Sequence, residues 1–351
     1  MKQVLKKWFE QYFSNEEAVL LSIMLIVSFI VLATLGSILG PFIAAVIIAF
    51  LLQGLVNNLQ KIGMPKLTSV LTTYLFFLFA FISTLVIIIP IIGRQTSLLL
   101  RELPTMVAQL KELLTSFPEK LSDYIGPEQL QLILVRGSEE LANLAEQLLS
   151  FSISSFPNLL GVMIYIVLVP LLVFFMLKDK DELLTMVSDL LPRERKVMTT
   201  IWSEMNMQFA NYVRGKAIEI VIVGMVSFIA FLILGLQYAA LLSLLIGLSV
   251  LIPYIGATVV TIPVLLVGYF QWGYSSEFLW LVVVYGIIQL LDGNVLVPLL
   301  FSEVVNLHPV AIIIAVLLFG GIWGFWGLFF AIPLATLVKA VYNAWPSNPV
   351  K

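Results

Sequence analysis

The sequence contains no cysteine and a single histidine, His308. Without cysteine there can be no disulfide, no thiolate metal ligand and no cysteine nucleophile. One histidine excludes a metal centre built from several histidines, so we expect no metal site and no cofactor. The motifs of nucleotide hydrolysis and of zinc proteases, GxxxxGK[ST] and HExxH, are missing as well. These absences indicate that the protein is not an enzyme.

Charged residues are also scarce, because they make up only 11% of the chain and leave a net charge of −2. Soluble globular proteins carry about 25% charged and about 45–50% apolar residues. Here 60% of the residues are hydrophobic and the mean hydropathy is +1.05. The near-neutral charge gives no reason to expect a nucleic acid as partner. The composition instead predicts a protein whose partner is the lipid bilayer.

Long apolar runs fill most of the chain. A run of about 20 apolar residues, folded as a helix, spans the hydrocarbon core of a bilayer. We therefore predict an all-α integral membrane protein with about eight transmembrane or re-entrant helical segments. The runs lie roughly at 18–35, 38–56, 68–92, 156–177, 217–235, 239–268, 278–300 and 309–338.

Residues 94–155 differ from the segments on either side, because three prolines punctuate polar helices with amphipathic spacing. Such helices pack on one another, on a neighbouring subunit or on the membrane surface. The chain thus divides into three parts. Residues 1–93 hold a polar N-terminus and three membrane helices, 94–155 form a helical insertion, and 156–351 form a core that contains a linker helix at 178–216.

Lysine and arginine are distributed unevenly along the chain. Fourteen of the 19 lie near the termini, in the 57–67 loop or in the 178–216 segment, and the other five lie in 94–155 beside eight acids. Cytoplasmic loops of membrane proteins carry an excess of lysine and arginine. The distribution therefore predicts cytoplasmic N- and C-termini and an extracytoplasmic position for residues 94–155.

Two of the apolar runs, 239–268 and 309–338, are longer than a membrane span. As single helices each would be about 45 Å long, against a hydrocarbon core of about 30 Å. Both are interrupted near the centre by residues that break or loosen helices. The breaking residues are Pro253, Tyr254, Gly256 and Pro263 in the first run, Gly320, Gly321, Gly324, Gly327 and Pro333 in the second, and Pro298 and Pro309 around the loop that precedes it.

A shift of 70 residues lays one run on the other without a gap and aligns Pro263 with Pro333. Paired broken segments in corresponding places are typical of the binding sites of secondary transporters. Each run is either one long span or a re-entrant hairpin. Both alternatives leave the C-terminus on the same side, and the adjoining loops carry no lysine or arginine that would decide between them.

One carboxylate lies deep in an apolar run, within the stretch IIQLLDGNVLVPLLFSEVVNLHPV. An ionised carboxylate at such a depth costs several kcal/mol unless it is paired or hydrated. We interpret this residue, Asp292, as a cation- or proton-responsive group that faces a polar cavity. The alternative is a structural acid that hydrogen-bonds exposed backbone beside Gly293. Gln289 and Asn294 would help to line a polar pocket in either case.

Three further ionisable residues are candidates for the same site. Glu219 follows Lys216 by three residues, so it belongs either to an interfacial ion pair or to the transport path. His308, just before the final run, is either a pH-sensitive group or a polar cap of the helix. Glu303 lies in the same loop as His308 and carries the same alternatives.

Five ordered motifs resemble those of the AI-2E family of transporters, and together they cover most of the chain from residue 156 onward. The motifs are VPLLVFFMLKDKDELL (169–184), NYVRGKAIE (211–219), SVLIPYIGATVVTIP (249–263), LDGNVLVPLLFSEVVNLHP (291–309) and GGIWGFWGLFFAIPLA (320–335). The chain departs from the family pattern in carrying Lys216 and Ala257, where members often have glutamine and proline. Ser302 and Glu303 stand where a glycine often follows the phenylalanine.

The resemblance implies a multi-pass protein of the bacterial inner membrane with cytoplasmic termini. Proteins of this kind are similar to exporters of the signal autoinducer-2 and to sodium(lithium)/proton antiporters. The resemblance also implies a homo-oligomer, with a pentamer as one arrangement, and paired hairpins that move in an elevator manner.

From these observations we expect a secondary transporter driven by an ion gradient, since the sequence contains no ATP-binding motif. Its substrate is either a small polar solute, such as autoinducer-2, or a monovalent cation exchanged for protons. Asp292 would be the ion-responsive carboxylate, and the two breaks would form the walls or gates of the site. The alternative is a non-transporting scaffold or regulator of the membrane that acts through the 94–155 helices.

Overall fold

The computed structural model describes residues 16–36, 38–116, 159–189, 196–253, 255–301 and 307–344. Within these ranges the chain forms helices and no strands, and seven helices are long and apolar enough to cross a bilayer. The predicted all-α membrane fold is thereby confirmed. Most of the expected helical insertion, residues 117–155, lies outside the described ranges.

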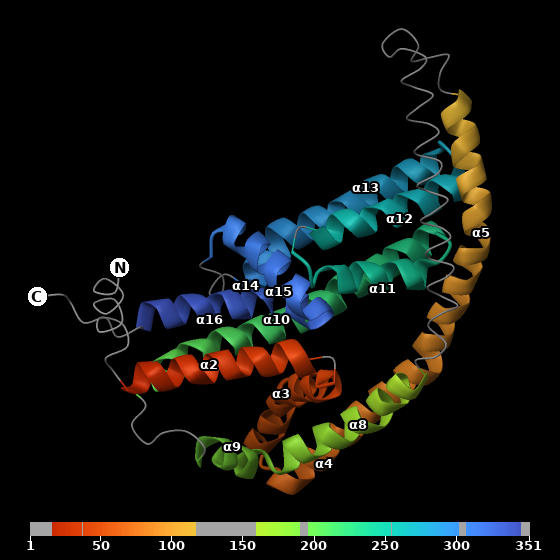
Figure 1. Ribbon diagram of the computed structural model, residues 1–351. Helices are drawn as coiled ribbons and strands as arrows, with labels where there is room; N and C mark the ends of the chain where they lie inside the picture. The colour runs from red at the N-terminus through yellow and green to blue at the C-terminus, as the bar shows by residue number, and fades with distance from the viewer. Residues whose placement is uncertain are drawn as a thin grey trace, which may run out of the picture.

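The first half of the chain comprises α2 (Glu16–Leu35), α3 (Gly40–Lys61), α4 (Lys66–Ser83), α5 (Ile89–Ser116) and α8 (Leu159–Lys178). Helices α3, α4 and α8 form a bundle at one edge of the molecule, whereas α2 packs on α10 (Lys196–Leu234) and α5 on α11 (Ala239–Ser249) (Figure 1). Helix α3 packs against α4 and α8 through small and branched side chains. Close approach of this kind stabilises helix pairs in a membrane, where lipid provides no hydrophobic driving force. The buried members of the contact are Ala45, Ala49, Val56, Val70, Val169, Val173 and Leu177.

A widened helical turn joins α4 to α5. The π-helical segment η1 (Thr84–Ile88) ends two residues before Pro90. Proline has no N–H group, so the carbonyl four residues earlier loses its α-helical partner, and the helix takes up one extra residue in front of it. Together α4, η1 and α5 form a curved rod along the outside of the molecule (Figure 1).

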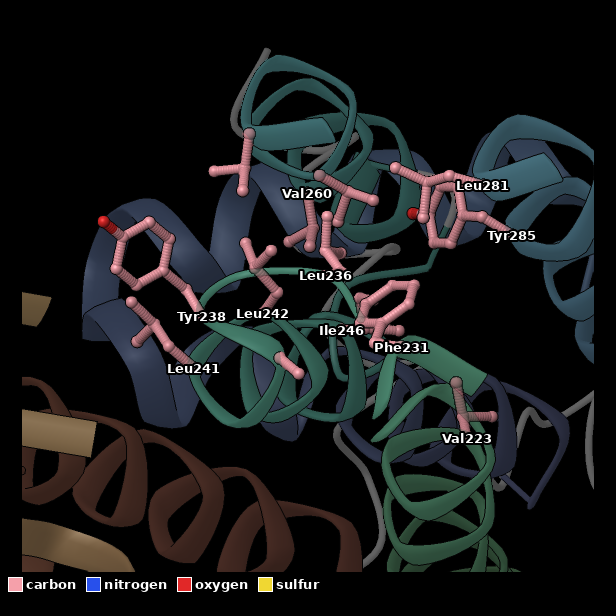
Figure 2. Close-up of a cluster of buried hydrophobic side chains, with 13 residues drawn as sticks. Val223, Phe231, Leu236, Tyr238, Leu241, Leu242, Ile246, Val260, Leu281 and Tyr285 are labelled. Atoms are coloured by element: carbon pink, nitrogen blue, oxygen red, sulfur yellow. The ribbon is translucent and has the colours of Figure 1, made fainter. Parts of the chain in front are cut away.

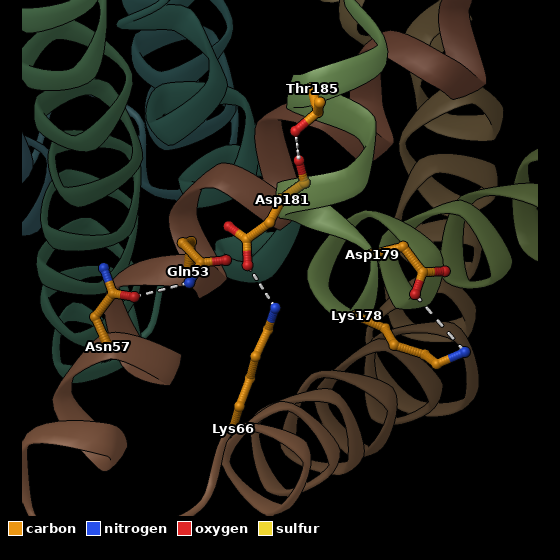
Figure 3. Close-up of polar contacts among 7 residues, drawn as sticks. All are labelled: Gln53, Asn57, Lys66, Lys178, Asp179, Asp181 and Thr185. Atoms are coloured by element: carbon orange, nitrogen blue, oxygen red, sulfur yellow. Dashed lines mark hydrogen bonds and ion pairs between the residues drawn. The ribbon is translucent and has the colours of Figure 1, made fainter.

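A short helix, α9 (Lys180–Asp189), ties the polar end of this bundle together. Lys66, at the start of α4, donates a hydrogen bond to the carboxylate of Asp181 (Figure 3). Next to this pair, the Nζ atom of Lys178 lies 3.7 Å from Oδ1 of Asp179 (Figure 3). The first pair is exposed and the second is partly exposed, as expected for an end of the molecule that lies outside the apolar layer.

Helix α10 (Lys196–Leu234) contains 39 residues and is the longest α-helix among the described residues. At about 1.5 Å per residue it is about 58 Å long, nearly twice the thickness of a bilayer core. The linker helix was predicted at 178–216, and in the structure residues 196–216 of that segment form the first part of α10, continuous with the apolar part that follows. No proline interrupts the chain between the two parts.

The first long apolar run folds back on itself as a hairpin. Its arms are α11 (Ala239–Ser249) and α12 (Ile255–Trp272). The arms are antiparallel, because Gln271 near the end of α12 accepts a hydrogen bond from the backbone of Gln237 and donates one to the carbonyl of Gly235, just before α11. Helix α11 is about 16 Å long and cannot cross a bilayer core of about 30 Å.

The second long run forms a hairpin of the same design. Helix α15 (Pro309–Phe329) kinks at Gly324 and packs against α16 (Ala331–Ala344). Gly324 has φ 57° and ψ −133°, a conformation that is open essentially to glycine alone. Both runs therefore fold back as hairpins and not as single long helices, while α12 and α15 are each long and apolar enough to be candidate membrane spans.

The hairpins share their internal spacing as well as their shape. Helix α15 begins 70 residues after α11. The turn of the second hairpin lies at Gly324, so its arms are residues 309–323 and 325–344. At each tip a glycine of the second arm touches the backbone of the first arm. A Cβ atom on Gly256 would overlap the carbonyl oxygen of Ser249, and one on Gly327 would overlap that of Phe319. Ser249 and Phe319 are again 70 residues apart, in agreement with the internal repeat seen in the sequence.

The first hairpin is clamped between α10 and α13 (Ser276–Leu291). Figure 2 shows the apolar cluster that holds it. Phe231 near the C-terminal end of α10, Leu242 and Ile246 of α11, and Leu281 of α13 are fully buried in this cluster. The base of the hairpin therefore lies at the C-terminal end of α10.

The second hairpin enters from the other end of α10. Near its base, Ala340 of α16 packs with Met198 and Ile201, in the first turns of α10. The two tips meet near the middle of α10, where Leu251 of the first hairpin and Phe329 of the second belong to one buried cluster. Hairpins that enter from opposite ends of a long helix and meet near its middle have the relation expected for an inverted repeat.

Between the hairpins, α13 continues through a second π-helical segment, η3 (Asp292–Leu296), into α14 (Val297–Phe301). This segment ends two residues before Pro298, the same offset that separates η1 from Pro90. Residues 276–301 together form one candidate membrane span. Its widened turn lies beside the point where the hairpin tips meet.

Candidate functional site

A cavity of about 410 Å³ opens where the two hairpin tips, α10 and the α13–α14 helix come together. This volume lies within the range of small-molecule binding sites, about 300–1,000 Å³. Most of its wall is apolar, with Val250 and Pro253 from the first hairpin and Ile312 and Ile332 from the second. The polar side chains in the wall come from α10 and α13–η3.

Helix α10 presents three polar side chains to the cavity from one face. Tyr212, Lys216 and Glu219 are spaced by four and three residues, which places them above one another along a helix. All three are buried, with 1%, 5% and 2% of their surface exposed. Glu219 lies about 22 Å from the C-terminal end of α10, so it is far from either end of the helix.

The Lys216 ammonium group joins α10 to the tip of the first hairpin. Its Nζ atom donates hydrogen bonds to Oε2 of Glu219 and to the carbonyl oxygen of Val250, each at 2.7 Å. The same atom lies 5.1 Å from the centroid of the Phe301 ring, within the range of a cation–π interaction. We expected an interfacial position as one reading of the Lys216–Glu219 pair, whereas the structure buries it.

Tyr212 joins α10 to the tip of the second hairpin. Its hydroxyl group donates a hydrogen bond of 2.9 Å to the carbonyl oxygen of Phe329. That carbonyl would normally accept from the N–H group four residues later, but position 333 is a proline. Pro333, predicted as a break, thus leaves a buried backbone acceptor that Tyr212 satisfies.

Asp292 lines the cavity from the first position of η3. Its Oδ1 atom is buried and has no hydrogen-bond partner among the described residues. The charges of Lys216 and Glu219 both act on this part of the site, the first attracting the Asp292 carboxylate and the second repelling it. One cation and two carboxylates therefore share a small volume inside the apolar layer.

A chain of hydrogen bonds leads from the cavity into the first hairpin. Gln289, which lines the cavity, donates to the hydroxyl of Tyr285 at 2.9 Å. The same hydroxyl lies 3.0 Å from Oγ1 of Thr261 in α12. This chain links α13 to α12 and fixes the orientation of the Gln289 amide.

Several residues predicted for the site lie elsewhere. Asn294 is exposed and donates to the carbonyl of Leu290 in its own helix. His308 caps α15, because its Nδ1 atom accepts from the N–H group of Val310 at 3.3 Å. Tyr254 and Glu303 lie outside the described residues. Among the predicted breaks that the structure describes, only Pro253 and Pro298 line the cavity.

Lys216 and Tyr212 were not assigned to the site from the sequence. A lysine and a tyrosine that precede Glu219 at helical spacing, inside a largely apolar helix, are the signal that points to them. Their partners in the two hairpins are backbone carbonyls, which leave no mark on residue type. In the part of the chain that the structure describes, no three histidine, aspartate or glutamate side chains converge as a metal site would require.

Comparisons with known proteins agree with the motifs of the sequence. Residues 20–347 match the family described as AI-2E family transporter. The chain is 41% identical over 350 residues to "Putative permease PerM" of Escherichia coli (strain K12), a match that covers 100% of this chain and 99% of that protein. It is 30% identical over 312 residues to "Putative transport protein YueF" of Bacillus subtilis (strain 168), over 86% of this chain and 82% of that protein. A "Putative transport protein" of Thermotoga maritima is 22% identical over 348 residues, 96% of this chain and 97% of that protein.

Proposed function

Since the chain belongs to the AI-2E transporter family, we propose that it moves a small polar solute across the membrane by ion-gradient-driven secondary transport, with Asp292 as the ion-responsive group. The observation that carries this proposal is the buried Oδ1 atom of Asp292, which has no hydrogen-bond partner among the described residues and lies in a cavity between two opposed hairpins. An unpaired acid inside an apolar layer is costly, and such residues usually mark an ion or substrate path.

The arrangement of the hairpins supports transport over a purely structural role. In secondary transporters, broken helices from two inverted repeats meet at mid-depth and form the substrate site. Irregular backbone at that depth is tolerated where protein or a water-filled cavity satisfies its polar groups. Here the tips of both hairpins meet beside the cavity and are held by side chains of α10.

The carboxylate of Asp292 would couple the solute to a proton. In its charged form it attracts Lys216, and in its neutral form it frees the cavity of net negative charge. A monovalent cation exchanged for protons is the rival cargo, because the same oxygen can bind a cation. The proposal places the protein in a bacterial inner membrane, with the loops rich in lysine and arginine and both termini on the cytoplasmic side. It also includes assembly as a homo-oligomer.

Flux across proteoliposomes tests the proposal. The purified chain would be reconstituted and exposed to imposed proton and sodium gradients, with small polar metabolites and monovalent cations as cargo. We expect gradient-driven flux in the wild type and a loss of at least about tenfold in Asp292→Asn, because the neutral amide cannot exchange a proton. Asn294→Leu is the matched control, since Asn294 lies on the same helix and outside the cavity.

Each outcome of this experiment has a distinct meaning. Equal flux in wild type and Asp292→Asn would keep transport but make the carboxylate structural. Flux of a cation alone would select the rival cargo. Assembly with other envelope proteins, in a chain that shows no flux for any cargo, would favour the scaffold that acts through residues 94–155.

A further inference from the structure

We infer that the Lys216 ammonium group occupies a monovalent-cation position at the tip of the first hairpin, so that this site requires no inorganic cation. In many secondary transporters, backbone carbonyls at unwound segments and at the C-terminal ends of half-helices hold a coupling cation. Lys216 lies at such an end, and its contacts are those that a bound cation would make.

The first contact is with the end of a half-length helix. Helix α11 ends at Ser249, and Val250 is its C-terminal cap. The carbonyls at a helix C-terminus carry partial negative charge and have no partner within the helix. The carbonyl of Val250 accepts its hydrogen bond from the Lys216 Nζ atom at 2.7 Å.

The second and third contacts complete a cation's surroundings. Glu219 provides a carboxylate oxygen 2.7 Å from the Nζ atom, and the Phe301 ring offers its centroid at 5.1 Å. Carboxylate, carbonyl and aromatic groups are all favourable neighbours of a cation. The ammonium and the carboxylate are almost entirely withdrawn from the surface, since the two side chains are 6% and 2% exposed. The position is therefore enclosed and filled by the chain itself.

The charges in the cavity define what remains to be bound. Lys216 balances Glu219, and Asp292 is left with an oxygen that has no partner among the described residues. One proton on Asp292 makes the three groups neutral in sum. This step rests on the proposed function: if the chain is a secondary transporter, its coupling ion at this cavity is a proton and not sodium or potassium.

Vacating the position tests the inference directly. Lys216→Ala removes the ammonium group and leaves Glu219, the Val250 carbonyl and the space between them. Thermal unfolding of the purified full-length chain would be followed in detergent at constant ionic strength, with lithium, sodium, potassium, methylammonium or N-methylglucamine as the cation. We expect the wild-type Tm to be the same in all five. The variant should have a lower Tm that rises saturably with at least one small cation and not with N-methylglucamine.

Two controls separate this result from a general salt effect. Lys216→Met also removes the charge but fills the space with a side chain of similar length, so its Tm should be lowered and should not rise with any small cation. In the double variant with Lys216→Ala and Glu219→Gln, the response to cations should be weakened. Lys216→Ser, whose hydroxyl fills part of the space, replaces Lys216→Ala if the alanine variant is not recovered.

Two results would overturn the inference. The first is a saturable and selective rise of the wild-type Tm with sodium, lithium or potassium that Glu219→Gln removes. The second is a Tm of Lys216→Ala that rises no more with small cations than the Tm of Lys216→Met does. Because unfolding does not depend on flux, a positive Tm result without flux would leave the cation position standing and contradict the transport proposal. Flux with no Tm response would do the reverse.

Discussion

The first hairpin (residues 239–272) meets α10 through an ammonium group, and the second (residues 309–344) meets it through a phenol. In both cases the side chain comes from the same face of α10 and the acceptor is a backbone carbonyl at the tip. Lys216 also pairs with Glu219 and is attracted by Asp292, whereas Tyr212 donates to Phe329 alone. We call these two contacts the charged tie (Lys216 to the carbonyl of Val250) and the neutral tie (Tyr212 to the carbonyl of Phe329). They are alike in geometry and differ in charge.

This difference shows how two similar hairpins can respond differently to one ion. A neutral hydrogen bond contributes about 1 kcal/mol and does not depend on the charge of its surroundings to first order. An ion pair inside an apolar layer depends strongly on every charge near it, because the low dielectric screens little. If Asp292 binds a proton as proposed, the proton would weaken or strengthen the contact of Lys216 with the first hairpin and leave the contact of Tyr212 with the second nearly unchanged.

The largest effect should come from removing the carboxylate that balances Lys216. Glu219→Leu leaves a buried ammonium group without its counter-charge, which typically costs about 3–5 kcal/mol of stability. Adding Lys216→Met should recover much of this loss, because an apolar pair of similar volume replaces a buried ion pair at little cost. Unfolding of the two single variants and the double variant in detergent measures the coupling. If the stability losses of the two single variants added up in the double variant, Lys216 and Glu219 would not be energetically coupled.

The hydrogen bond between Tyr212 and the carbonyl of Phe329 should contribute less, and a backbone N–H group can replace its donor. Tyr212→Phe leaves the buried carbonyl of Phe329 without a donor and should cost about 1–3 kcal/mol. Adding Pro333→Ala supplies the N–H group that this carbonyl lacks, so the double variant should be more stable than Tyr212→Phe alone. Pro263→Ala, at the corresponding position of the first hairpin, is the control and should give no such gain. The comparison is read from the same unfolding curves.

The smallest effect is expected for an ion pair in water, which sets the scale for the buried one. The hydrogen bond and the charge of Lys66 lower the pKa of Asp181 from its usual value of 3.8. The pair therefore stabilises the fold above pH 4 or so and loses this contribution as the pH falls through the lowered pKa. The Tm of Lys66→Met should lie slightly below that of the wild type at pH 6, and the gap should shrink at pH 3. A gap that widens on acidification would contradict this assignment.

The membrane fold and the two broken runs could be predicted because their signals are local. Hydropathy over about 20 residues identifies a membrane helix, and a proline or glycine within a run marks a break without reference to the rest of the chain. Asp292 was found in the same way, since an acid in an apolar run is conspicuous wherever it occurs. The structure places Asp292 and two of the breaks, Pro253 and Pro298, in the wall of the cavity.

The contacts that complete the cavity could not be predicted, because they join side chains to backbone across long separations. Val250 lies 34 residues beyond Lys216, and Phe329 lies 117 beyond Tyr212. Any residue type offers a carbonyl, so neither partner is visible in the sequence. The choice between hairpins and spans was hidden for a related reason, because the adjoining loops carry no lysine or arginine to report their side.

Asn294 illustrates how a nearby polar residue can still face away. It follows Gln289 by five residues and lies within the π-helical segment η3, where regular α-helical spacing does not hold. Its amide donates to its own backbone, and the side chain is exposed. Sequence proximity to Asp292 was therefore a poor guide to its position.

The widened turn at η3 changes the phase of the helix that carries the cavity. Gln289 and Phe301 both line the cavity, yet twelve residues apart they would differ by about 120° in direction on a regular α-helix. A turn that absorbs one extra residue reduces the difference to about 20°. The set of positions that face the cavity thus shifts by one residue at Asp292. A helical-wheel projection that continued the spacing of α13 would wrongly place the cavity-facing residues of α14 on the lipid side. Pro298 lacks an N–H group and thereby favours the widened turn at η3. Because of this turn, α13 and α14 face the cavity with the same side of one continuous helix.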